Sequence, residues 1–157
     1  MQGGSAQVTT EENQKEFIQT AKSYAKKAQD LGITTALYMT HAYTDADIRY
    51  EPKLINKITK TYYEAGKKSN SIVIPVGLAF DMAYKIRPDI TLHHEDGTHP
   101  GPLGTYLGAA TVFASITGKS PVGLNFNYYN SIDDESRLFL QEIAWKAYLK
   151  AENELSL

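Results

Sequence analysis

Apolar residues recur at intervals of three and four positions through the first part of the chain, separated by charged and polar residues. This spacing predicts an amphipathic helix with one buried face. Thr9 and Glu12 form a capping box at its start, and Gly32 provides a stop at its end. The residues expected on the buried face are Phe17, Ala21, Tyr24, Ala28 and Leu31.

Two short runs, Ile33–Met39 and Ser71–Val76, are rich in β-branched residues and predict strands. The second run is almost continuously apolar, which is typical of a parallel strand buried on both faces. Between them, Pro52 opens a predicted helix that ends at Gly66. Its buried stripe comprises Ile55, Ile58, Tyr62 and Ala65. A strand–helix–strand order predicts parallel neighbours joined by a right-handed crossover.

The rest of the chain favours helices separated by one long loop. We expect a helix over Leu78–Ile86, a loop over Arg87–Gly101, and a helix from Pro102 to Gly118. A last amphipathic helix begins between Ser131 and Asp134. This order predicts an α/β layered fold. Two strands do not make an independently stable sheet, so either the N-terminal part of the fold is lacking or strands come from a partner chain, including a second copy.

Composition narrows the classes of function. The 157 residues carry a net charge of −2 and contain no cysteine. This excludes disulfides and argues against a nucleic-acid partner, which usually meets a basic stripe. No apolar run approaches the roughly 20 residues of a membrane span. The N-terminal residues lack the features of a signal peptide, so the protein is either cytoplasmic or has a leader outside this sequence.

The predicted loop over Arg87–Gly101 holds three of the four histidines and the pair Asp96-x-x-His99. A serine hydroxyl needs an adjacent base to become a nucleophile, and histidine serves because its pKa lies near 6.5. The base in turn needs a partner that fixes its tautomer, and an aspartate in the same turn can supply one. The alternative is that Asp96 and Gly97 simply form a turn.

The segment from His93 to Ala110 resembles the last block of SGNH/GDSL hydrolases, in which an Asp-x-x-His pair precedes the final helix of the sheet domain. Gly104-Thr105-Tyr106-Leu107 and Thr117-Gly118-Lys119-Ser120-Pro121 resemble the continuation in relatives that act on carbohydrate-like esters. Gln2-Gly3-Gly4-Ser5 is similar to a turn after a central strand in that branch. The resemblance implies one SGNH-like domain over residues 1–157, three-layered (α/β/α) and flavodoxin-like, without its N-terminal strand and nucleophile turn.

The resemblance also implies an activity, which is hydrolysis of an acyl ester, with carbohydrate esters as the suggested class, and no cofactor. His99 would be the general base, Asp96 its orienting partner, and the Gln2 amide an oxyanion donor. Ser5 is not expected to be the nucleophile, because only two residues precede its glycines and a nucleophile turn needs a strand before it. The chain alone should therefore be inactive. The rival interpretation is a degenerate SGNH domain that binds a ligand or a partner.

Other polar residues carry weaker expectations. His41 follows the first predicted strand, where α/β sites gather, and is a candidate for the wall of a cleft. His93 and His94 are expected at the rim of that cleft. A metal site formed by His93, His94, Asp96 and His99 is a second alternative, although adjacent histidines on one loop rarely converge on one ion. Asp45 and Asp47 are expected to be a solvated loop pair.

Overall fold

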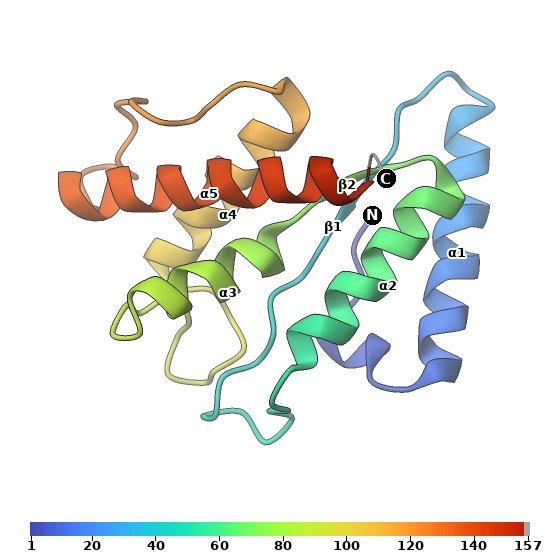
Figure 1. Cartoon of the computed structure of the whole chain (residues 1–157), viewed down its shortest axis with the longest axis horizontal. Coiled ribbons are helices and arrows are strands. Elements are labelled where there is room, and N and C mark those ends of the chain that lie inside the picture. The colour runs from blue at the N-terminus through green and yellow to red at the C-terminus, as the bar shows by residue number, and fades with distance from the viewer. Residues whose placement is uncertain (156–157) are drawn as a thin grey trace.

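The computed structural model of the chain describes residues 1–155 and has a helix-rich α/β fold (Figure 1). A short 3-10 helix, η1, comes first. The elements in chain order are η1 (Ser5–Val8), α1 (Glu11–Gln29), β1 (Ala36–Tyr38), α2 (Leu54–Ser69), β2 (Ile72–Ile74), α3 (Val76–Ile86), α4 (Pro102–Thr117) and α5 (Asp134–Leu155).

The two strands are parallel neighbours connected through α2, which confirms the predicted strand–helix–strand unit. Ala36 pairs with Ile72 and Tyr38 with Ile74. Each strand has only three residues, fewer than predicted. The first run is shortened because the Ile33 N–H still bonds to the Ala28 carbonyl at the end of α1, 3.0 Å away. The second is shortened because Pro75, which has no N–H to donate, caps α3.

The backbone of Met1 lies along the other side of β1. The Met1 amino group donates to the Ala36 carbonyl at 2.6 Å, and the Tyr38 N–H donates to the Met1 carbonyl at 2.8 Å. This is the pattern of a parallel ladder, in which Met1 stands opposite Leu37. The edge of the sheet away from β2 is therefore formed by the first residues of the chain.

Alternate strand residues face two separate hydrophobic cores. Leu37, Met39 and Val73 pack with α1 and α2. Ala36, Ile72 and Ile74 contact the core of α3, α4 and α5. In Figure 1, α1 and α2 lie together at one end of the molecule, and α3, α4 and α5 gather at the other. Both faces of the small sheet are thus covered, as its apolar sequence predicts.

The first helix begins one residue later than predicted and buries only part of the predicted face. Thr10, not Thr9, caps α1, because its hydroxyl oxygen accepts the Asn13 N–H at 3.2 Å. The buried residues are Ile18, Ala21 and Ala25. Tyr24 and Leu31, which were predicted to be buried, are 59% and 78% exposed. Ala21 is buried and Phe17 packs on Tyr62, so only part of the predicted stripe faces the core.

The second helix begins at Leu54 rather than at Pro52 and passes through Gly66 to Ser69. Gly66 is not its stop, since Asn70 takes the left-handed conformation and ends the helix. A side chain at Gly66 would collide with Val73 of β2, so the glycine permits close helix–strand packing. The third helix starts at Val76, two residues before the prediction, while α4 and α5 match their predicted starts.

Gly77 lies where the backbone after β1 packs closely against the start of α3. A Cβ atom there would collide with the carbonyl oxygen of Thr40, and the Gly77 N–H already donates to Met39 at 3.0 Å. We expect Gly77→Ala to lower the free energy of unfolding by about 1–3 kcal/mol in urea titrations. Gly4→Ala is the control, with nothing within 4 Å of its added Cβ, and should stay within about 0.5 kcal/mol of wild type. Equal stability of the two variants would contradict this packing.

Candidate functional site

The loop between α3 and α4 is folded back on itself as a short hairpin. The His94 N–H donates to the His99 carbonyl, and the Gly101 N–H donates to the Leu92 carbonyl, both at 2.8 Å. His93 and Pro100 form an antiparallel bridge. Gly97 closes the turn with a φ of +68°, a conformation that favours glycine. The hairpin presents Asp96 and His99 at its tip.

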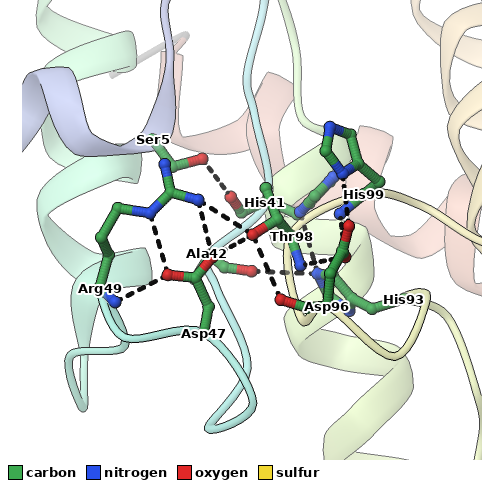
Figure 2. A network of polar contacts seen from close by, with 9 residues as sticks. All are labelled: Ser5, His41, Ala42, Asp47, Arg49, His93, Asp96, Thr98 and His99. Atoms are coloured by element: carbon green, nitrogen blue, oxygen red, sulfur yellow. Dashed lines mark hydrogen bonds and ion pairs between the residues drawn. The ribbon is translucent and has the colours of Figure 1, made fainter.

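Asp96 and His99 are hydrogen-bonded, as expected from their spacing (Figure 2). One carboxylate oxygen of Asp96 accepts the backbone N–H groups of Thr98 and His99 at 2.8 and 2.9 Å. The other oxygen lies 2.6 Å from Nδ1 of His99. The His99 side-chain bond and then these backbone bonds hold the pKa of Asp96 well below its usual range.

The ionised carboxylate can only accept, so Nδ1 of His99 carries the proton that joins them. Nε2 of His99 has no hydrogen bond to any residue in the range 1–155 and points away from Asp96 (Figure 2). The His99 side chain is 73% exposed. The pair therefore presents an oriented imidazole whose outer nitrogen is open to an incoming group.

A second loop, between β1 and α2, clamps the hairpin in place. The Thr44 N–H donates to the Gly97 carbonyl at 3.0 Å. The Thr98 hydroxyl donates to the Asp47 carboxylate, and Arg49 bonds the same carboxylate at 2.9 and 2.7 Å. Arg49 also donates to Thr98 at 3.0 Å. A side chain at Gly97 would meet Thr44 and the Asp47 backbone, so only glycine fits between the loops.

The expectation that Asp47 is a solvated loop residue is wrong. Its side chain is only 7% exposed, and its bonds to Arg49 first, then Thr98, hold its pKa well below the usual range. Asp45 is exposed, as predicted. No local pattern distinguishes the two aspartates, because Thr98, the partner that anchors Asp47 to the hairpin, lies about 50 residues further along the chain.

His41, which follows β1, meets His93 at the base of this hairpin. His93 Nε2 lies 3.0 Å from His41 Nδ1 and 3.1 Å from the Ala42 carbonyl. Because that carbonyl can only accept, His93 carries its proton on Nε2, and its Nδ1 accepts the Tyr84 hydroxyl at 2.6 Å. The ring of His41 stacks on Phe80 at 4.5 Å.

Both imidazoles resist protonation. Burial, followed by the positive charge that His93 can carry, lowers the pKa of His41 to about 4. Burial is also the main cause that lowers the pKa of His93. Neither histidine has an acidic side chain bonded to its ring, in contrast to His99. The two are therefore held neutral and serve as a buried pair, while His99 remains accessible.

His93 also lines a cavity of about 410 Å³ between the β1–α2 loop and α3. Aromatic side chains form much of its wall, with Tyr43, Tyr50, Phe80 and Tyr84 beside His93. Asp96, His99 and His41 are absent from the lining, and His94 is exposed elsewhere on the hairpin. The sequence did not single out Phe80 or Tyr84, whose positions on the helix look like ordinary core positions.

Gln2 and Ser5 lie apart from the cavity. Gln2 is exposed and lines a groove of about 580 Å³ beside α1, together with Phe17 and Tyr24. Ser5 starts the helical turn that follows Met1, and its hydroxyl bonds to the His41 carbonyl at 2.6 Å and lies 3.1 Å from the Thr40 hydroxyl. No imidazole nitrogen contacts the Ser5 hydroxyl, so it lacks the base that activates a nucleophile.

The histidines do not gather into a metal centre. In the part of the chain that the structure describes, no three or more His, Cys, Asp or Glu side chains are grouped to hold an ion. His93 faces His41, His94 faces solvent, and His99 faces Asp96. The same residues include no helix with the length and apolar character needed to cross a bilayer.

Comparison with solved structures places this α/β chain beside a known fold. It is similar to a DUF4886 family protein from Bacteroides uniformis, with a TM-score of 0.67 and 21% sequence identity. The match covers 74% of this chain and 48% of that protein, so the similarity extends over about half of its length. At this identity the likeness concerns the fold alone. No family model and no curated protein matches the sequence.

The buried histidine pair should make stability depend on pH. The unfolded chain protonates His41 near pH 6.5, whereas the native protein does so only near pH 4. The contribution of neutral His41 to the free energy of unfolding is therefore fully present above pH 6.5. It decreases as the pH drops towards 4, by roughly 3 kcal/mol. Lowered pKa values at Asp47 and Asp96 act only below this window. Urea unfolding at a series of pH values measures the effect.

His41→Gln separates this effect from general acid sensitivity. The Gln amide oxygen can still accept from His93, so the variant should fold, yet its stability should fall less between pH 6.5 and 4. His94→Gln is the matched control, because that side chain is exposed and should leave the pH profile unchanged. An unaltered profile for His41→Gln would contradict the assignment.

Proposed function

We propose that this chain carries the acid–base half of an SGNH-type ester hydrolase within an N-terminally incomplete, three-layer, flavodoxin-like domain. The observation that supports this proposal is the Asp96–His99 pair at 2.6 Å, with Nε2 of His99 open on the surface. The sequence resemblance around these residues points to the same chemistry. The substrate class is an acyl ester, with carbohydrate esters suggested by the branch that the chain resembles.

In this mechanism Nε2 of His99 accepts the proton of an attacking hydroxyl and later returns it to the leaving alcohol. Asp96 stabilises the imidazolium that forms, and its two backbone bonds hold the carboxylate ready before reaction. The Gln2 amide is the proposed oxyanion donor. Ser5 does not supply the nucleophile, because its hydroxyl is bonded to a backbone carbonyl.

A specific observation favours the rival function, a binding module derived from such a domain. The aromatic cavity beside His93 does not include Asp96 or His99. Tyr43, Tyr50 and Phe80 give it aromatic walls, and the Tyr84 hydroxyl already bonds to His93. Charged side chains complete the lining, from Asp45, Glu51, Lys53 and Asp81. Such a cavity can hold a small ligand without any bond being broken. Loss of the nucleophile would leave this cavity intact.

His99 should be the most reactive imidazole towards acylating reagents. Its Nε2 is exposed, and the bond from Nδ1 to Asp96 keeps the lone pair on Nε2. We expect diethyl pyrocarbonate to modify His99 before His94, as followed by mass spectrometry of peptides. Asp96→Asn should slow this modification, because the tautomer that leaves the lone pair on Nε2 is no longer fixed. Preferential modification of His94 in wild type would count against the proposed base.

The purified 157-residue chain should hydrolyse aryl acetates at a rate close to that of His99→Ala. Acyl transfer needs a nucleophile, a base and an oxyanion donor together, and a site without one member keeps only a small residual rate. Chromogenic release of the phenol measures this. Robust turnover that is lost in both His99→Ala and Ser5→Ala would show a nucleophile inside the chain and would overturn the incomplete-domain proposal.

A further inference from the structure

The charged groups around the aromatic cavity are predominantly negative. The lining holds three carboxylates and one ammonium group, from Asp45, Glu51, Asp81 and Lys53. Glu51 pairs at 2.6 Å with Lys57, and Asp81 pairs at 2.7 Å with Lys85. The carboxylate of Asp45 has no ion pair to any residue in the range 1–155. Because a carboxylate only accepts hydrogen bonds, this lining repels anions and favours a ligand with positive charge.

The buried polar groups of the cavity offer nothing that would hold an anion. The Tyr84 hydroxyl donates its proton to Nδ1 of His93 at 2.6 Å. The proton on Nε2 of His93 is directed at the Ala42 carbonyl, 3.1 Å away. Burial is the main cause that lowers the pKa of His93, so its ring adds no positive charge. Both groups are therefore neutral, and their protons are already bonded within the protein.

Aromatic rings in the same wall supply an attraction for a cation. The face of a tyrosine or phenylalanine ring is electronegative and attracts a positive charge within about 6 Å. Tyr43 already binds one in this way, since the guanidinium carbon of Arg49 lies 4.2 Å from the centre of its ring. Tyr43 lines the cavity together with Tyr50 and Phe80, whereas Arg49 does not. The cavity thus combines aromatic faces with carboxylates, as sites for organic ammonium groups do.

The cavity belongs to the half of the molecule around β2. β1 lies between the Met1 backbone and β2, and α3 follows β2 directly. The cavity is formed by the β1–α2 loop and α3. Strands that continue the sheet beyond Met1 would therefore be added at the opposite edge. An N-terminally longer domain leaves the cavity as it stands.

We propose that the cavity between the β1–α2 loop and α3 binds a small organic ammonium ion, held by the Asp45 carboxylate and the rings of Tyr43 and Tyr50. The volume of about 410 Å³ is that of a small-molecule site. A bare metal ion is not the expected cation, because residues 1–155 contain no group of three or more metal-binding side chains. The inference rests on the binding-module function proposed above, whose ligand class it names.

Choline is the probe, and its control is the alcohol in which a tert-butyl group replaces the trimethylammonium group. The two have nearly the same shape and differ in charge. In NMR titrations of the isotope-labelled 157-residue chain at constant ionic strength, choline should bind roughly tenfold more tightly. The shifted signals should belong to the β1–α2 loop and α3. Added sodium chloride should weaken the binding of choline and leave that of the neutral alcohol unchanged.

Tyr50→Leu and Asp45→Asn test the two kinds of contact. Tyr50 is 48% exposed and Asp45 is exposed, so both variants should fold. Each should weaken choline binding by roughly two- to fivefold. Tyr24→Leu and Asp30→Asn, at exposed positions of α1 and its C-terminal cap, are the matched controls and should bind choline like wild type.

The outcomes separate the ligand class from the binding function itself. Equal affinity for choline and the neutral alcohol, unchanged choline affinity in both cavity variants, or tighter binding of methyl glucoside at the same residues would overturn the ammonium ligand. In the first and third cases the cavity remains a binding site. Absence of any shift in the β1–α2 loop and α3 with all three probes would overturn the binding module as well. The acylation of His99 is measured separately and is independent of these results.

Discussion

Parallel pairing of β1 with β2 is the constraint on which the arrangement of the site depends. The ladder continues past the strand ends, where the Met39 N–H donates to Ile74 and the Gly77 N–H donates to Met39. Both strands therefore release their following loops at the same edge. One loop carries His41 and Asp47, and α3 after the other strand carries Phe80 and Tyr84. The absence of a side chain at Gly77 lets the two exits approach.

The clamp between the loops converts this proximity into a fixed geometry. Asp47, Arg49 and Thr98 share one set of hydrogen bonds, and Gly97 lies in the only conformation and space that permit it. The Asp96 carboxylate accepts three hydrogen bonds within the hairpin, one of them from the imidazole of His99. The exposed imidazole of His99 is thus held by polar bonds rather than by burial, in contrast to the neutral pair of His41 and His93.

Local sequence rules predicted some elements closely and others with an offset of a few residues. Pro102 and Gly118 marked α4 correctly, because a first-turn proline and a left-handed glycine act within the helix itself. The prediction that α2 ends at Gly66 was wrong, because this glycine permits close contact with Val73 of β2 rather than ending the helix. The face of α1 was misjudged for a related reason. Its apolar residues form a wide stripe, and packing on α2 selected only part of it for burial.

The sequence by itself determined the strand–helix–strand unit and the Asp96–His99 bond, because the first follows from the order of consecutive elements and the second from a spacing of three residues. The resemblance to SGNH hydrolases drew on the same local segment. Only the tertiary structure decided that Asp47 anchors Thr98 and that His41 meets His93, each across about 50 residues. Such contacts depend on which loops a shared sheet edge brings together, and no local spacing records that. The exposed Tyr24 was decided in the same way, by the neighbours that α1 has in space.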